Sequence, residues 1–169
     1  MISYILALVC GILILIFDQL TKYYIMSNFY LGQSCDFIKG LIDIVYIHNE
    51  GAAWGMLSGR TWILICFTVI AMTFCGYFFY KYGRTNKLML WGLTLVTSGG
   101  IGNLIDRIFR DGKVIDFLHF EFWPQFPVFN VADCAIVVGV GLLILYFIID
   151  TVNEAKSKHT EKESENADN

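Results

Sequence analysis

The sequence predicts an all-α integral membrane protein with four transmembrane helices and a small extracytoplasmic β-sheet. Of its 169 residues, 56% are hydrophobic and 16% are aromatic, and the mean hydropathy of +0.58 is too high for an ordinary soluble domain. Four segments are apolar over the roughly 20 residues that a helix needs to cross a bilayer. Two of the connecting segments are rich in β-branched and aromatic residues, which favours short strands.

The first predicted span runs from Ile2 to about Tyr24. No Lys or Arg precedes it and no small-residue cleavage site follows it, so we expect it to remain as a transmembrane helix rather than be removed as a signal peptide. The other spans are predicted at Trp62 to Tyr80, Leu88 to Ile105, and Val131 to Ile149. Residues 1–150 therefore form one membrane domain, with outer loops at 25–61 and 106–130.

The distribution of cations predicts the orientation of the chain. Four crossings place both termini on one side of the membrane, and the loop "KYGRTNK", residues 81–87, has cations but no acid. Short cation-rich loops stay in the cytoplasm, so this loop and both termini are expected there. The tail, residues 151–169, is polar, charged and without apolar periodicity, so we expect it to be disordered.

Two outer segments carry the strand pattern. They are "LIDIVYIHN", residues 41–49, and "VIDFLHF", residues 114–120, and we expect them to form a small sheet at the membrane surface. An amphipathic surface helix at residues 56–63 or 25–31 remains open.

Charge and cysteine content exclude other classes of protein. The formal net charge is −3 and Lys and Arg are not clustered, so we expect no nucleic-acid partner. Cys10, Cys66, Cys75 and Cys134 lie in apolar runs and only Cys35 lies in a polar loop, which argues against a disulfide framework.

The predicted topology brings the unusual polar residues to one boundary of the membrane. The first and third spans end, and the second and fourth begin, at the outer face, whereas the rest of the spans is almost free of ionisable groups. A functional site at the outer interface is therefore expected. Its candidate members are Asp18, Lys22, Asn103, Asp106, Arg107 and Asp133 from the spans, with Asn49 and Asp116 from the outer segments.

Several of these residues also have a purely structural interpretation. Asp18 and Lys22 in "FDQLTK" are four residues apart, so they share a helix face and can pair. In "GGIGNLIDR", residues 99–107, the glycines permit close helix contact. Asn103 and Arg107 share a face there, and they fit an internal polar network as well as a grip on a substrate carbonyl.

Asp116 and Asp133 differ from the others because neither shares a face of a predicted helix with a cation. As a structural alternative, Asp133 is an acid in the first turn of a helix, favoured by the dipole, with Asn130 as the N-cap. The alternation in "KVIDFLHF" directs Asp116 toward the start of the fourth span. Two carboxylates at a partly dry interface share one proton, and such a pair can activate water for attack on an amide.

Five motifs, in this order and spacing, resemble those of the lipoprotein signal peptidases, also called signal peptidase II or prolipoprotein signal peptidase. They are "FDQLTK", "NEGAAWG", "GGIGNLIDR", "KVIDF" and "FNVAD". The resemblance extends over residues 18–133 and the flanking spans. It implies an aspartic endopeptidase of the bacterial plasma membrane that removes signal peptides from prolipoproteins, cutting just before a diacylglyceryl-modified cysteine.

The resemblance also implies roles for particular residues. The catalytic pair of the family corresponds to Asp116 and Asp133, with no metal or organic cofactor. The partners it implies are lipid-modified prolipoproteins and membrane lipids, and we expect a monomer. No role is carried over to His48, Glu50 or His119. The substrate-binding or supporting positions correspond to Asp18, Lys22, Asn49, Gly99, Asn103, Asp106, Arg107, Asn130 and Ala132.

Two alternative functions agree less well with the sequence. A thiol or metal enzyme would use Cys134, His48 and His119, but a nucleophilic Cys needs an adjacent base and zinc needs three or four ligands, whereas these residues are scattered singly. A transporter or channel subunit would place ionisable groups near the bilayer midplane, whereas here they gather at one boundary.

Overall fold

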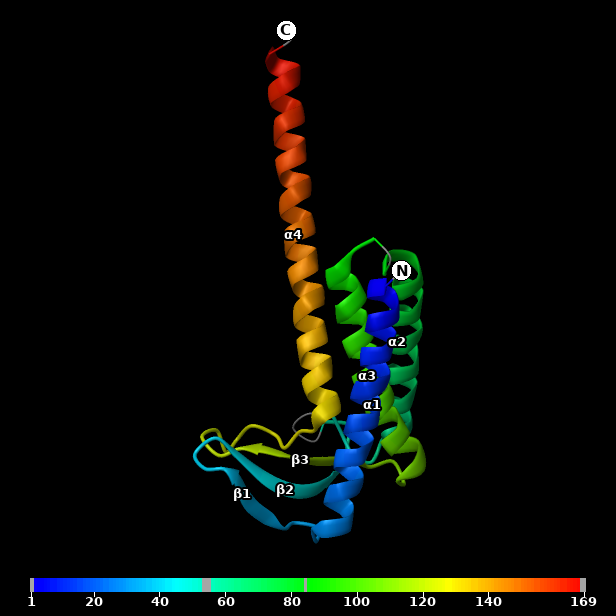
Figure 1. Ribbon diagram of the computed structural model, residues 1–169, viewed down its shortest axis with the longest axis vertical. Helices are drawn as coiled ribbons and strands as arrows, with labels where there is room; N and C mark the ends of the chain where they lie inside the picture. Colours follow the sequence, from blue (N-terminus) through cyan, green and yellow to red (C-terminus); the bar gives the residue numbers. More distant parts are fainter. Residues whose placement is uncertain (1, 53–55, 84, 168–169) are drawn as a thin grey trace.

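The computed structural model describes residues 2–52, 56–83 and 85–167, with side chains described through Lys158. Its helices run roughly side by side, and a small sheet lies across one end of them (Figure 1). The elements in chain order are α1 (Ile2–Asn28), β1 (Ser34–Ile38), β2 (Ile42–Asn49), α2 (Thr61–Tyr82), α3 (Lys87–Phe109), β3 (Val114–Phe120) and α4 (Val131–Ala167).

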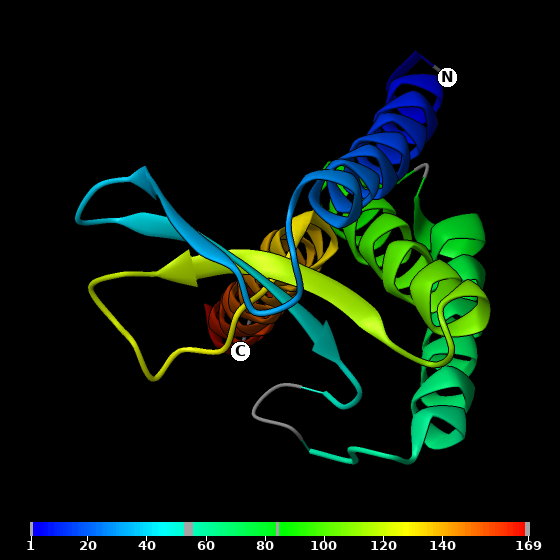
Figure 2. The same cartoon turned by 90° about the horizontal axis from the view of Figure 1, so that it is seen from below.

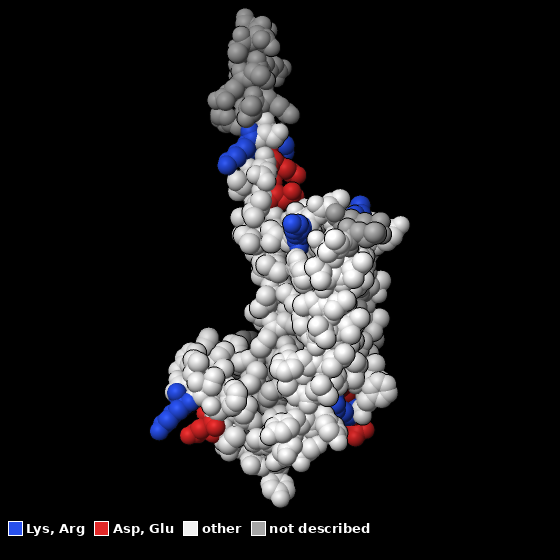
Figure 3. Space-filling model, in the orientation of Figure 1, with Lys and Arg blue, Asp and Glu red and all other residues white. Residues whose placement is uncertain are grey.

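All four helices are long and apolar enough to cross a membrane, which confirms the predicted fold class. Charged side chains gather toward the two ends of the molecule, and the surface between them carries none in the view of Figure 3. An uncharged band between two charged ends is the pattern that a bilayer requires of the helices that cross it.

The sheet is antiparallel with strand order β1-β2-β3. It lies across the N-terminal end of α4 and projects beyond the helices (Figure 2). The sequence predicted β2 and β3, which pair with Ile47 opposite Asp116 and Asn49 opposite Val114. The third strand, β1, was missed because its residues are exposed along its whole length, so its sequence lacks the alternation that marks a half-buried strand.

The C-terminal end of α1 packs on the sheet. Ile25 from α1 forms a buried cluster with Tyr46 of β2 and with Ile115 and Phe117 of β3. Residues 25–28 are thus the last turn of α1, and residues 56–59 form turns before α2 begins. In the described part of these two segments the chain does not form a separate surface helix.

The tail differs from its prediction, because α4 continues as one helix to Ala167 instead of ending in a disordered segment. Residues 151–167 contain no Pro or Gly and are rich in Glu, Lys and Ala, which are good helix formers. They also follow a helix that already exists, so they extend it without the cost of nucleation. In Figure 1 this extension stands well clear of the other helices.

Candidate active site

A buried ionic cluster joins the C-terminal parts of α1 and α3. Lys22 Nζ lies 2.9 Å from Asp18 Oδ2 and 3.0 Å from Asp106 Oδ2. It also donates to Asn103 Oδ1 at 3.0 Å. The exposed fraction is 0% for Lys22, 1% for Asp18 and 0% for Asp106. Buried charges are tolerated only when they are paired, so each member of this cluster depends on the others.

The two acids of this cluster also hold backbone groups of β3 and α4. Asp106 Oδ2 accepts a hydrogen bond from the backbone N–H of Ile115 at 3.1 Å, and Asp18 Oδ1 accepts one from the backbone N–H of Ala132 at 2.9 Å. Ile115 directly precedes Asp116, and Ala132 directly precedes Asp133. The cluster therefore anchors the chain immediately before each of the two candidate catalytic residues.

Asn130 connects these two carboxylates. Its side-chain Nδ2 donates to Asp116 Oδ1 at 2.7 Å, and its backbone N–H donates to Asp133 Oδ2 at 3.1 Å. Its Oδ1 accepts from the backbone N–H of Asp133 at 3.0 Å, as the N-cap interpretation predicted. Asn130 is fully buried, so its position is fixed by these bonds and by the packing around it. The N-cap contact of Asn130 is thus present together with a hydrogen bond from Asn130 to each of the two acids.

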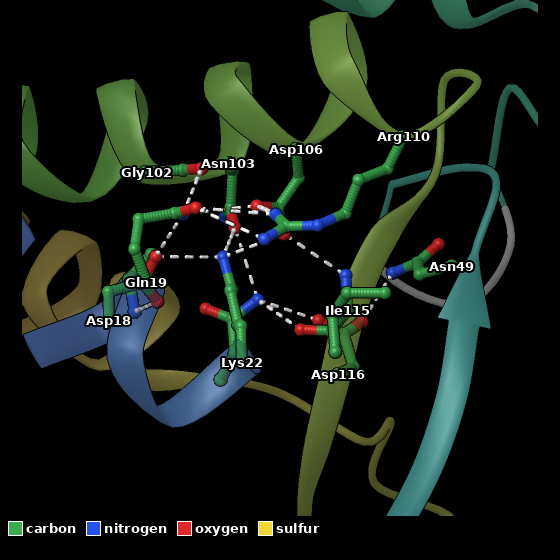
Figure 4. A network of polar contacts seen from close by, with 12 residues as sticks. Asp18, Gln19, Lys22, Asn49, Gly102, Asn103, Asp106, Arg110, Ile115 and Asp116 are labelled. Atoms are coloured by element: carbon green, nitrogen blue, oxygen red, sulfur yellow. Dashed lines mark hydrogen bonds and ion pairs between the residues drawn. The ribbon is translucent and has the colours of Figure 1, made fainter. Parts of the chain in front are cut away.

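Two further amides complete the hydrogen bonding of the pair. Asn49, at the end of β2, donates from Nδ2 to Asp116 Oδ2 at 2.8 Å (Figure 4). Asn103 donates from Nδ2 to Asp133 Oδ1 at 2.7 Å, while its Oδ1 accepts from Lys22. Both oxygens of each carboxylate thus accept a hydrogen bond.

The surroundings of Asp116 disfavour its negative charge. Burial and the nearby charge of Asp133 raise the pKa of Asp116 to about 7, against the opposing effect of the hydrogen bonds from Asn49 and Asn130 and of the Lys22 charge. Asp116 is 1% exposed, whereas Asp133 is half-buried. Below about pH 7 the pair therefore retains a proton that two isolated aspartic acids would have lost.

Small residues let α1, α3 and α4 approach closely beside the pair. A Cβ added at Gly102 would lie 2.7 Å from Asp18 Oδ2, and one added at Gly99 would clash with the carbonyl oxygen of Ala132. Ala132 itself is fully buried. Gly99 and Ala132 thus occupy positions where the packing of α3 on α4 limits side-chain size.

Arg107 lies at the edge of the site. Its Nη2 donates to the carbonyl oxygen of Gly51 at 3.0 Å, which ties α3 to the connection between β2 and α2. Its Nε is buried and has no hydrogen-bond partner among the described residues. Trp54, in the "NEGAAWG" motif, lies outside the described residues together with positions 53 and 55.

Sequence analysis missed two members of the ionic cluster. Gln19 Nε2 donates to Asp18 Oδ2 and to Asp106 Oδ1, both at 3.0 Å, and Arg110 pairs with Asp106. Arg110 was detectable, because it lies four residues after Asp106 on the same helix face. Gln19 is marked in the sequence only by its place next to Asp18.

The residues of the thiol or metal alternative lie apart. His48 Nε2 lies 2.8 Å from the Tyr46 hydroxyl, whereas His119 lies by Asp43, nearer the other end of the β2–β3 pair, and Cys134 is exposed on α4. Within the described residues, His, Cys, Asp and Glu do not form a group of three or more that could hold a metal ion.

Four helices long and apolar enough to cross a membrane, with two carboxylates joined by one asparagine at one end, are the arrangement expected of an aspartic hydrolase embedded in the membrane. Residues 10–149 match the family model described as signal peptidase (SPase) II. The lipoprotein signal peptidase of Bacillus pumilus (strain SAFR-032) is 42% identical over 134 residues, which cover 79% of this chain and 86% of that protein. The chain belongs to the signal peptidase II family, the membrane aspartic proteases that remove signal peptides from prolipoproteins.

Two solved structures, each described as that of a bacterial membrane enzyme, share the fold. The first has a TM-score of 0.82 and 36% identity, and the match covers 87% of this chain and 90% of that chain. The second has a TM-score of 0.77 and 35% identity, with 83% and 91% covered. Together with the family match, they identify the protein as a bacterial multi-pass membrane protease.

Proposed function

We propose that Asp116 and Asp133 are the catalytic pair of this prolipoprotein signal peptidase. The main support is that Asn130, which is fully buried, donates a hydrogen bond to each of the two carboxylates. The ionised member of the pair takes a proton from water as the water attacks the scissile carbonyl. The protonated member polarises that carbonyl and then helps to protonate the leaving amine.

We place the shared proton on Asp116. It is the more deeply buried of the two, and the Asp133 charge disfavours its ionisation. Asp133, at the more exposed start of α4, then acts as the base toward water. This assignment needs no metal or cofactor, because the pair supplies both the base and the acid.

The contacts separate the supporting residues into two groups. Asn103 is bonded to Lys22, Asn130 and Asp133, and Asn49 to Asp116, so we assign them to positioning the pair. Arg107 has a buried Nε without a partner among the described residues, so we assign it to binding a carbonyl of the substrate. We therefore propose a place in the internal network for Asn103 and a substrate contact for Arg107.

We further propose that the enzyme is a monomer that cuts just before the diacylglyceryl-modified cysteine, with the lipid chains left in the bilayer beside the helices. A direct test compares purified enzyme on lipidated and unlipidated precursor. Remote binding energy from the lipid places the carbonyl against the pair, so the lipidated precursor should be cut far faster. Equal rates would show that the lipid is not recognised.

The orientation is part of the same proposal: both termini are cytoplasmic and Asp116 faces the outside. Support comes from the cations of residues 81–87 at the helix ends opposite the sheet. Single cysteines at position 85 and position 36, in a cysteine-free background, test it with a membrane-impermeant thiol reagent. Position 36 should label in intact cells and position 85 only after lysis, and the reverse result would invert the topology.

A further inference from the structure

A surface cavity of about 370 Å³ borders Asn49, the residue that donates a hydrogen bond to Asp116. Its lining includes Asn49, which donates to Asp116, and Gly51, whose carbonyl oxygen accepts from Arg107. The cavity therefore shares a wall with the candidate active site. Its volume lies at the small end of the range of about 300 to 1,000 Å³ for binding pockets, enough for a short stretch of peptide.

The lining comes entirely from the outer segments of the chain. It consists of the end of β2, the connection that follows it, Ser58, and the Pro127–Val128 segment that leads to α4. Residues of the four helices do not contribute to this described lining. The cavity is thus walled by residues that lie outside the four candidate membrane spans.

Polar groups set the chemistry of this cavity. His48 Nε2 lies 2.8 Å from the Tyr46 hydroxyl, and burial together with the Lys113 charge lowers the pKa of His48, which disfavours the charged ring. Glu50 lines the cavity and pairs at 3.2 Å with Lys113, which lies outside the lining. Glu50 is half-exposed, so its carboxylate remains available to a second partner.

The substrate has only one part that leaves the membrane on this side. The apolar stretch of the signal peptide and the lipid on the cysteine both stay in the bilayer, whereas the mature chain continues outward from that cysteine. We propose that the cavity receives the residue that follows the modified cysteine, and that Glu50 disfavours an acidic side chain there. This inference rests on the proposed function, since it takes the pair and its outward orientation as given.

The test uses three lipidated precursor peptides that differ only in the residue after the modified cysteine, which is Lys, Ser or Asp. The wild-type kcat/KM should fall in that order, by about fivefold overall, as expected for a partly exposed charge pair. The difference in kcat/KM among the three peptides should become smaller as the salt concentration is raised. Glu50→Gln should remove the preference and Glu50→Lys should reverse it.

Asp36→Lys is the matched control, because it makes the same charge change on exposed β1, away from the cavity, and should leave the order unchanged. The inference is overturned if Glu50→Lys keeps the wild-type order of kcat/KM among the three peptides. It is also overturned if Asp36→Lys changes that order as much as Glu50→Lys does. A failure of the proposed function gives a different result: the Asp116→Asn variant would still cleave the Ser peptide. Failure of the cavity assignment alone appears as wild-type turnover that ignores the varied residue.

Discussion

The side-chain amide of Asn130 lies 2.7 Å from the Asp116 carboxylate, and both residues are almost completely buried. One residue at the start of α4 thus fixes a carboxyl group that belongs to β3. Since the backbone N–H of the same asparagine also donates to Asp133, a shift of either element would move the two acids relative to each other.

Asp116→Asn and Asp133→Asn should each reduce turnover by orders of magnitude, and the double variant should add little, because the pair acts as a unit. If Asp133 served only as a dipole partner, the change would cost about 0.3 to 1 kcal/mol of stability and leave turnover nearly intact. The measurement is cleavage of lipidated precursor by purified variants whose folding and precursor binding have been verified. A single variant that keeps more than about a tenth of normal turnover, a loss under about 1.4 kcal/mol of barrier, would exclude that residue from the pair.

The activity should depend on pH through Asp116. Because its pKa is raised to about 7, the pair loses its shared proton as the pH rises through neutrality, so kcat/KM should fall on the alkaline side with an apparent pKa near that value. A profile that stays flat from pH 6 to pH 9 would contradict the shared proton.

The free energy of unfolding should show the same ionisation. Asp116 stays protonated in the folded protein up to about pH 7, whereas the unfolded chain ionises near its ordinary value of 3.8, so folding loses stability as the pH rises between these values. The loss is on the order of 4 kcal/mol at most. Asp116→Asn lacks this loss, so its melting temperature relative to wild type should rise between pH 4 and pH 7, and parallel curves would disagree with the raised pKa.

Lys22→Met should destabilise the protein by about 3 to 5 kcal/mol, because it leaves Asp18 and Asp106 buried without their cation. Lys39→Met is the matched control on an exposed lysine and should change stability by about 0.5 kcal/mol or less. Thermal unfolding of both variants in the same detergent gives the comparison. Equal melting temperatures would mean that the buried cluster contributes no net stability.

Gly99→Ala should lower both stability and turnover, because the added methyl group meets the backbone of α4 at Ala132, next to Asp133. Overpacking of this kind costs about 1 to 3 kcal/mol. Gly141→Ala, the same change on α4 where the added atom meets open space, should leave turnover intact and alter stability by about 1 kcal/mol or less. Identical effects of the two substitutions would argue against close packing at Gly99.

The parts of the fold that were predictable are those with a local signature. Apolar length marks a span, and the strand pattern of "LIDIVYIHN" marks β2, so neither needs knowledge of the rest of the chain. The exposed strand β1 has no such pattern. The Lys22–Asp106 ion pair could not be predicted from the sequence either, because it joins residues on separate helices and depends on how α1 packs against α3.

The candidate site was predictable to the extent that topology brings its members to one boundary. Topology cannot say which member bonds to which. Asn103 and Arg107 lie on one face of α3, but they have different partners. Asn103 donates to Asp133 because α4 packs beside it, whereas Arg107 donates to the carbonyl oxygen of Gly51. The helical tail was mispredicted because polar composition was weighed without the helix that precedes it.

The anchoring of Ile115 by Asp106 and of Ala132 by Asp18 has a consequence for the newly made enzyme. The candidate site draws on α1, β2, α3, β3 and the first turn of α4, and of its components Asn130 and Asp133 are the last to be synthesised. A chain whose fourth helix has not yet entered the membrane has neither the second acid nor the amide that joins it to the first. On the proposed assignment of the catalytic pair, the protease is therefore inactive until its fourth helix docks.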